Sequence, residues 1–461
     1  MKTTKKSMIF AMTLLLLTGC GADKAENAMT ADVKSDAASS AAEPAAEKSD
    51  AKDAAAGAAA EEMNDAIEYF CAEDAEGEAF AAKSADYAPD AMAEIPAGAD
   101  DGGEYDGEYI GDEPDPIDFM PRSGEPFVLT AGEWNDNANW GFFANLVHNG
   151  TIEFPAFGLD PTGRIAVTVT HDGAAVQNQT VLLNADDTHI WQAKTDKNGV
   201  AYLFFGADYA GQTLTVETAD AELTEVEVPA SFKAGQGGRS IPMLEVNVET
   251  AADTTKYVDT QVMFILDTTG SMGDEITYLQ KDFSAIAEEV ANDNMTFSVN
   301  FYRDKGDDYV TRCNPFTTDM QALQKALNAE YADGGGDTPE AVAQILDETM
   351  NSTEWRADTN KIAFLIFDAP PHSGEDDAAM LQNAVAAAAA QGIHLVPVVA
   401  SNAERETELF GRALSIMTNS NYVFLTDDSG VGDSHLEPII GDYDVELLHD
   451  IIVRNIREIA E

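Results

Sequence analysis

The most regular hydrophobic pattern in the chain lies in its C-terminal part, after about Tyr257. Apolar runs rich in β-forming residues, typical of strands buried on both faces, alternate there with amphipathic helical patterns. The runs are Val262–Leu266, Thr296–Tyr302, Tyr309–Cys313, Ile362–Phe367, Ile393–Val399 and Tyr422–Leu425. The helical patterns are Asp274–Val290, Asp319–Ala329, Pro339–Met350, Asp376–Gln391, Glu404–Met417 and Val445–Ile459. This alternation predicts an α/β domain at 257–461, with a doubly wound, mostly parallel, Rossmann-like sheet.

Between 119 and 250 the pattern changes to short alternating runs, such as Arg164–Thr170 and Thr213–Thr218. Regular turn signals without helical periodicity predict a small all-β sandwich. Asn198 and Gly199 stand between two strand-like runs and predict a type I′ hairpin. The run Thr195–Ala201 resembles the hairpin of carboxypeptidase-regulatory-like, Ig-like β-domains. That resemblance implies a spacer or binding module without catalysis.

The N-terminal segment combines basic residues with a short apolar run. Three lysines among the first six residues precede the run Met8–Leu17, which is too short to span a bilayer as a mature helix. We interpret 1–20 as a signal peptide. The run ends in Leu17-Thr18-Gly19-Cys20, which resembles a bacterial lipobox. The resemblance implies that Cys20 is lipid-modified and anchors an exported protein to the outer side of the cell membrane. An ordinary signal peptide with an incidental cysteine is the alternative.

Residues 21–118 are dominated by alanine, glycine and acidic residues, with 28 Asp and Glu against five Lys and no Arg. Because apolar side chains larger than alanine are sparse, little core can form to offset the loss of chain entropy. We expect a disordered, self-repelling acidic tether that holds the folded part away from the membrane. An acidic tail that binds a partner is the alternative.

The whole chain is strongly acidic, with 461 residues and a formal net charge of -57. This charge argues against nucleic acid as a partner, because phosphate binding needs Lys and Arg. It favours solubility and the binding of divalent cations. Besides Cys20, only Cys71 and Cys313 remain, and two distant cysteines form neither a disulfide framework nor a zinc site.

Candidate chemistry follows the first buried run, which ends on Asp267. Two hydroxyl residues, Thr269 and Ser271, come next at a spacing of two, with glycines between and after them. A helical pattern then begins. A carboxylate and two hydroxyls are therefore expected on a tight turn between strand and helix, where open α/β sheets bind ligands.

Two further loops should reach the same edge of the sheet. One is the glycine-rich loop at 333–340, in which Thr338 precedes Pro339 as an N-cap residue precedes the first helical position. The other follows the run Ile362–Phe367, where Asp368 ends the run as Asp267 ends the first one. Adjacent parallel strands would place both carboxylates at one edge.

These three loops resemble the metal-ion-dependent adhesion site of von Willebrand factor type A (VWA) domains. The family pattern is Asp-x-Ser-x-Ser after the first strand, Thr in a glycine-rich loop and Asp after the fourth strand. It maps onto Asp267, Thr269, Ser271, Thr338 and Asp368, with Thr269 in place of the usual first serine. The resemblance covers about 257–461 and implies non-enzymatic binding of a protein partner, whose acidic side chain completes the metal coordination.

The expected cofactor is Mg²⁺, with Mn²⁺ or Ca²⁺ as alternatives. All five candidate side chains offer oxygen, and hard oxygen ligands select these ions over zinc. The nearby Asp337 and Glu340 are expected to support the site from outside the ligand set or to favour the helix start by their charge. His372 is expected to orient the turn that follows Asp368.

Three other interpretations remain open. In the first, the hydroxyls serve only as helix caps, each of which contributes about 1 kcal/mol to stability. A serine hydrolase would use Ser271 on a strand-to-helix turn, with Asp368 and either His435 or His449. An envelope scaffold would hold a metal for stability alone.

Overall fold

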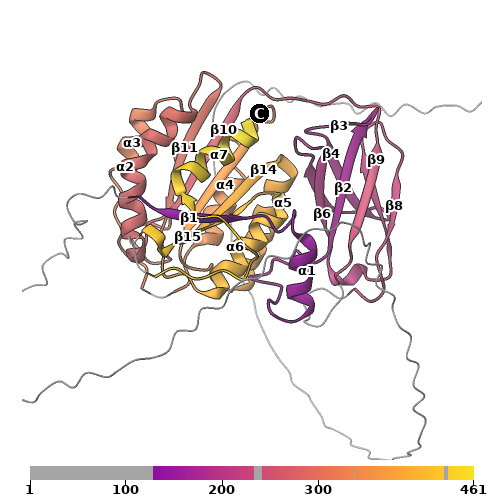
Figure 1. The fold of residues 1–461 in the computed structure, drawn as a ribbon, viewed down its shortest axis with the longest axis horizontal. Helices are drawn as coiled ribbons and strands as arrows, with labels where there is room; N and C mark the ends of the chain where they lie inside the picture. Colours follow the sequence, from indigo (N-terminus) through magenta and orange to yellow (C-terminus); the bar gives the residue numbers. More distant parts are fainter. Residues whose placement is uncertain (1–127, 233–240, 337, 353, 430–433, 461) are drawn as a thin grey trace, which may run out of the picture. The chain divides into compact units, whose positions relative to one another are not determined.

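The computed structural model describes residues 128–461 apart from 233–240, 337, 353, 430–433 and 461. The described part lies within one compact unit, 109–461 (Figure 1). The predicted signal peptide, Cys20, the acidic tether and Cys71 lie outside the described residues. Within the described part, no helix is both long and apolar enough to cross a membrane.

An eight-stranded sheet forms the centre of the C-terminal part, in the order β12-β11-β10-β13-β14-β15-β1-β16. Its strands are β1 (Thr130–Trp134), β10 (Thr260–Asp267), β11 (Met295–Tyr302), β12 (Thr311–Arg312), β13 (Asn360–Phe367), β14 (Ile393–Val399), β15 (Tyr422–Thr426) and β16 (Glu446–Leu447). Strands β11, β10, β13, β14 and β15 are parallel, and β12 and β1 run antiparallel to their neighbours. The predicted α/β class and mostly parallel sheet are confirmed.

Six helices follow the predicted helical patterns. They are α2 (Gly273–Val290), α3 (Met320–Leu327), α4 (Val342–Met350), α5 (Glu375–Gln391), α6 (Arg405–Met417) and α7 (Leu448–Ala460). One start is corrected: α4 begins at Val342 with Ala341 at its N-cap, so Thr338 and Pro339 do not open it. The reason is that the backbone N–H of Glu340 donates to the carbonyl of Pro370, which holds this segment extended.

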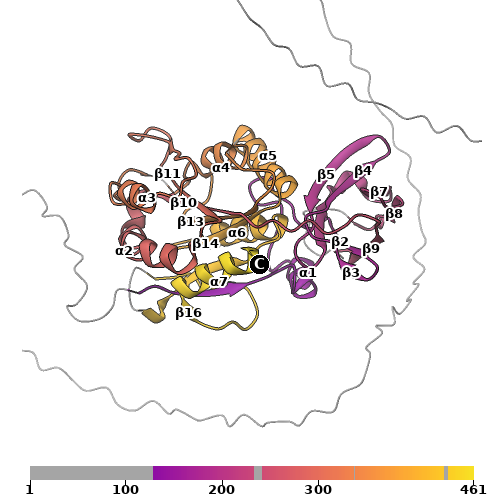
Figure 2. The same ribbon diagram turned by 90° about the horizontal axis from the view of Figure 1, so that it is seen from above.

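Both faces of the sheet are covered, as the unbroken apolar runs predict. Alternate residues of β10 enter different cores, with Met263 and Ile265 on one face and Phe264 on the other. Figure 2 shows α4 and α5 on one side of the sheet and α2 and α7 on the other. Central strands β10 and β13 are buried along their whole length.

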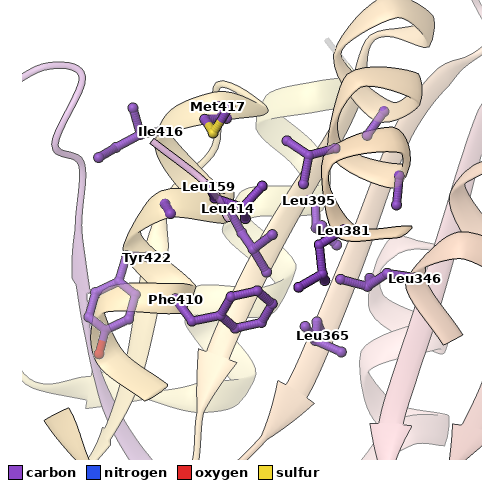
Figure 3. Packing of buried hydrophobic residues seen from close by; sticks show 14 of the residues in the cluster. Leu159, Leu346, Leu365, Leu381, Leu395, Phe410, Leu414, Ile416, Met417 and Tyr422 are labelled. Carbon is purple, nitrogen blue, oxygen red and sulfur yellow. The ribbon is translucent and has the colours of Figure 1, made fainter. Parts of the chain in front are cut away.

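One of these cores, called the leucine-rich core below, contains six buried leucines among other apolar side chains. Leu346 of α4, Leu365 of β13, Leu381 of α5 and Leu395 of β14 point toward one another (Figure 3). Phe410 of α6 closes this group and makes an edge-to-face contact with Phe367. Close packing of this kind holds the carboxyl ends of β13 and β14 in a fixed position.

A second, all-β part lies between β1 and β10 in the chain. Its two four-stranded sheets contain β2 (Arg164–His171), β3 (Ala174–Ala175), β6 (Val200–Phe204) and β9 (Leu244–Glu249), and β4 (Thr180–Ala185), β5 (Thr188–Lys194), β7 (Thr213–Thr218) and β8 (Thr224–Glu227). Inward-facing residues of both sheets, such as Val167 and Leu183, share one core. The relation of this part to Ig-like domains stays a prediction.

The turn at Asn198-Gly199 differs from the predicted type I′ hairpin. That turn needs positive φ at both central residues, but only Gly199 (φ 76°) is in that region. The Asp196 carboxylate accepts hydrogen bonds from the backbone N–H groups of Asn198 and Val200 and sets the turn instead. The strands on either side, β5 and β6, belong to different sheets.

Residues 130–134, which the sequence pattern places in the β-sandwich region, belong instead to the eight-stranded sheet. Strand β1 lies between β15 and β16 and pairs with both in antiparallel register. Helix α1 (Trp140–His148) follows it and contributes Phe143 to the leucine-rich core. The run TAGEW is short and contains glycine, so it lacks the hydrophobic alternation that would reveal a strand.

A fully buried ion pair fixes this N-terminal segment to α6. The guanidinium of Arg412 donates to both carboxylate oxygens of Asp136 over 2.8 Å each, and both side chains are 0% exposed. Arg412 also donates to Glu408, one turn away on α6. Since a bidentate pair satisfies both charges, the segment is tied to the α/β domain at a defined position.

We predict that Arg412→Ala lowers the free energy of unfolding by about 3–5 kcal/mol, because Asp136 is left buried without its partner. Urea denaturation measures the loss. Arg457→Ala, which removes a half-exposed pair with Glu289, is the control and should cost less than about 1 kcal/mol. Equal losses of stability in the two variants would show that the buried Arg412–Asp136 pair does not fix this segment.

Candidate functional site

The carboxylate of Asp267 stands at the end of β10 and is fully buried. Its Oδ1 accepts hydrogen bonds from the backbone N–H of Thr269 (2.9 Å) and from the Thr269 hydroxyl (2.7 Å). Its Oδ2 has no hydrogen-bond partner among the described residues. A short 3₁₀ turn, Gly270–Met272, leads into α2. The turn therefore folds back on the strand end and leaves one carboxylate oxygen available.

Asp368 lies beside it because β10 and β13 are parallel neighbours, with Leu266 in register with Ile366. Its side chain is buried, and Oδ1 has no hydrogen-bond partner among the described residues. Burial raises the pKa of this carboxyl group, and Ser271, on the turn after β10, lies close enough to oppose that rise. The structure thus brings together four of the five predicted ligands: Asp267, Thr269, Ser271 and Asp368.

The glycine-rich loop packs over the same turn. The carbonyl of Gly334 accepts from the N–H of Gly270 over 3.4 Å. Gly335, at φ 77°, leaves no room for a side chain, since a Cβ would stand 3.4 Å from Thr269 and 3.0 Å from Glu340 Oε1. Thr338 itself is exposed, and within the described residues its hydroxyl makes no hydrogen bond to the other four candidates. The loop contacts the site through Gly334 and Gly335, and the role of Thr338 as a ligand stays a prediction.

Burial makes ionisation of the carboxyl groups in this site unfavourable. Burial raises the pKa of Asp267 to about 6. Burial and then repulsion from Asp267 raise the pKa of Asp368 to about 7. Burial, with repulsion from Asp267, Asp304 and Asp368, raises the pKa of Glu340 to about 9. The site holds more negative charge than its own side chains neutralise, so it favours a cation or protons.

Sequence reasoning placed Glu340 outside the ligand set, but the structure places its carboxylate inside this cluster. It is 4% exposed, and Oε2 has no partner within the described part of the chain. Asp304 lies two residues after the end of β11. Its Oδ1 lies 2.6 Å from Nε2 of His372, which connects the turn after Asp368 to the segment that follows β11. The position of Asp304 just after a strand could have indicated that it lies near the site. For Glu340 the sequence offered only its place two residues after Thr338.

The donor set fits a hard divalent cation. Asp267, Asp368 and Glu340 each hold one oxygen without a hydrogen-bond partner in the described part of the chain, and Asp267 lies near enough to the other two carboxyl groups to repel them. Buried charges are otherwise paired or bound to metal. No three His, Cys, Asp or Glu side chains in the described ranges meet at metal-binding geometry. The predicted site needs only two carboxylates, because its other ligands are hydroxyls and water.

The residues of the hydrolase alternative are not brought together. His435 lies between Asp427 (2.8 Å) and the hydroxyl of Ser401 (3.1 Å). His449 lies between carboxylates of α2, with Asp282 at 2.8 Å. Neither contacts Ser271, whose hydroxyl is directed to Asp368. The buried Ser401 is not exposed for attack on a substrate either, and its hydroxyl donates to Glu275.

Comparison with known proteins agrees with this geometry. The family model described as von Willebrand factor A domain matches residues 261–433. This part of the chain is a VWA domain. Such a domain points to a role in protein interaction or adhesion. The chain is also 30% identical over 126 residues to a putative ariadne-like RING finger protein of Acanthamoeba polyphaga mimivirus. That match covers 26% of this chain and 12% of the viral protein, so it extends to a small part of either.

We predict that Asp368→Asn stabilises the protein in EDTA at pH 8 but has little effect at pH 5. A carboxyl whose folded-state pKa is raised contributes stability below its unfolded pKa of about 3.8, and loses it as pH rises through about 7. Asparagine removes the ionisation, and we expect a gain of about 1–3 kcal/mol at pH 8. Thermal unfolding across this pH range measures it.

Asp358→Asn is the matched control for this experiment. Its carboxylate is exposed and paired with Arg356, which lowers its pKa, so the substitution should not stabilise the protein at either pH. A gain for Asp368→Asn that is the same at pH 5 and pH 8 would show that burial of the charge is not its cause.

Proposed function

We propose that the protein is a non-enzymatic adhesion or interaction protein of a bacterial cell surface, and that its VWA domain binds a partner protein through a divalent cation. One observation carries the proposal. The buried carboxylates of Asp267 and Asp368 direct unpaired oxygens to one sheet edge, beside the hydroxyls of Thr269 and Ser271. An adhesion site needs this set, whereas a helix cap needs only the hydroxyls.

Asp267, Thr269, Ser271 and Asp368 would hold the cation, with Mg²⁺ preferred and Mn²⁺ or Ca²⁺ as alternatives. When bound, the cation supplies a positive centre with an open position for an acidic side chain of the partner. Thr338 completes the ligand set if its exposed loop turns inward. Glu340 lies outside this ligand set, near enough for Asp267 and Asp368 to add to the rise in its pKa that burial causes.

The proposal includes export and lipid anchoring through Cys20, with 21–118 as an acidic tether. In the sequence, the proposed tether is followed by a strand of the VWA sheet and not by the all-β sheets. The chain enters the eight-stranded sheet at β1, and only afterwards forms the two all-β sheets. The second part is therefore a side domain of the VWA domain, rather than a spacer between tether and VWA domain.

We predict that isothermal titration detects Mg²⁺ and Mn²⁺ binding to the wild type, and that Asp267→Ala loses it. Binding should be stronger at pH 8 than at pH 5.5, because the carboxyl groups must release their protons to bind the metal. Asp358→Ala, an exposed site, should bind as the wild type does. Identical binding by wild type and Asp267→Ala would end the metal proposal.

We further predict that immobilised protein captures a partner from envelope extracts with Mg²⁺ present, and that EDTA or Asp267→Ala abolishes the capture. Both treatments remove the cation that the partner's carboxylate would bind. Asp358→Ala again serves as the control, since its carboxylate lies outside the site. Capture that persists in EDTA would favour the scaffold alternative, in which the metal serves stability alone.

A further inference from the structure

A polar cavity lies at the amino ends of the parallel strands, opposite the ends that carry Asp267 and Asp368. Its volume is about 200 Å³, and its walls include Asn360 and Lys361 at the start of β13, and His394 at the start of β14. The β5–β6 connection and the last turn of α7 close it. Since Asp368 follows the other end of β13, this cavity and the proposed metal site do not overlap.

Two lysines in the wall of this cavity have no acidic partner. Lys361 is 2% exposed, and its Nζ donates to the backbone oxygens of Thr359 (2.9 Å) and Gln391 (3.3 Å). Lys194 donates to the hydroxyl of Tyr257 over 3.2 Å. The hydrogen-bond acceptors of both ammonium groups in the described part of the chain are thus uncharged, and the nearest acidic influence on Lys361 is that of Asp358. This is unusual in a protein with 83 acidic and 26 basic residues.

The two ammonium groups also lie close to each other. They stand 5.4 Å and 5.8 Å from the ring of Tyr257. Burial, and then repulsion from Lys194, lowers the pKa of Lys361 to about 8. The bond to Gln391 shows that Lys361 also caps the end of α5, but a capping role does not explain the second lysine. Two like charges beside one cavity favour an anion between them.

Two acidic residues, Asp196 and Glu458, also line the cavity, and neither forms an ion pair with Lys194 or Lys361 in the described part of the chain. The Asp196 carboxylate is occupied by two backbone N–H groups of its own turn and by the amide of Asn419. Glu458 is exposed on the last turn of α7, where Lys197 donates to its backbone oxygen. The cavity thus presents positive charge at one wall.

The remaining lining is rich in amide side chains. They come from separate elements and include Asn135, Asn178, Asn360, Asn421 and Asn455. Their NH₂ groups already donate to protein oxygens, so a ligand hydroxyl would donate to amide carbonyl oxygens such as those of Asn178 and Asn360. The volume is below the range of about 300–1,000 Å³ that is usual for drug-sized ligands. The cavity therefore suits a ligand about as large as a monosaccharide.

We propose that this cavity binds a small hydroxylated carboxylate, such as a sugar acid. Its carboxylate meets the ammonium groups of Lys194 and Lys361, and its hydroxyls meet the surrounding amides. The walls come from both the all-β part and the VWA domain, so the ligand joins the two. This site does not depend on the proposed metal.

Isothermal titration with D-glucuronate tests the proposal, with D-glucose as the matched sugar that lacks a carboxylate. All titrations contain EDTA, so that the metal site does not contribute. The wild type should bind glucuronate and not glucose. Lys361→Met and Lys194→Met should each weaken glucuronate binding at least about tenfold, because each removes a charge-assisted hydrogen bond. Lys325→Met, on the exposed face of α3, should bind as the wild type does.

Three results would each overturn the proposal. The first is no glucuronate binding by the wild type, and the second is binding that neither cavity substitution weakens. The third is equal binding of glucose and glucuronate, because the lysines would then have no role. Lys361 is buried, so Lys361→Met can also lower stability. Lys194→Met is the second variant for that reason, as this side chain is only half-buried.

Discussion

The structure depends on how it accommodates ionisable groups at the ends of a buried parallel sheet. Strand β10 is buried at every residue, and its last residue is a carboxylate with an unpaired oxygen. An isolated buried charge is costly, so such a group is neutralised by protons, paired with a cation or bound to a metal. Asp368 and Glu340 are also buried with an unpaired oxygen, and burial followed by repulsion from Asp267 raises their pKa values. The packing that fixes the strand ends therefore also creates the affinity for a cation.

The two ends of β13 have opposite electrostatic character. Lys361 stands near its start and Asp368 follows its last residue, separated by roughly 20 Å along the strand. The acidic site and the basic, amide-lined cavity thus lie at the two ends of one strand. The cores on both faces of the sheet hold this strand in place. Ligands of opposite charge can occupy the two edges without competing for space.

Sequence reasoning succeeded where the signal is local and strong. The apolar runs predicted the central strands, and the parallel register then placed Asp267 next to Asp368. It failed where position depends on distant contacts. Strand β1 is defined by pairing with β15, almost 300 residues later, and by the buried pair between Asp136 and Arg412. The start of α4 differs from the predicted one for the same reason: the backbone N–H of Glu340 donates to the carbonyl of Pro370, which holds this segment extended.

The position of β1 changes how a pull on the chain would reach the proposed binding site. A force applied at the N-terminal side enters the VWA domain through β1, whose five residues pair antiparallel with β15 on one side and whose first two pair with β16 on the other. Beyond them, the buried Asp136–Arg412 pair transfers the load to α6. The two all-β sheets, which follow β1 and α1 in the chain, lie outside this path. Residues of these sheets and their connections instead line the cavity at the start of β13 and β14, at the opposite end of the strands from Asp267 and Asp368.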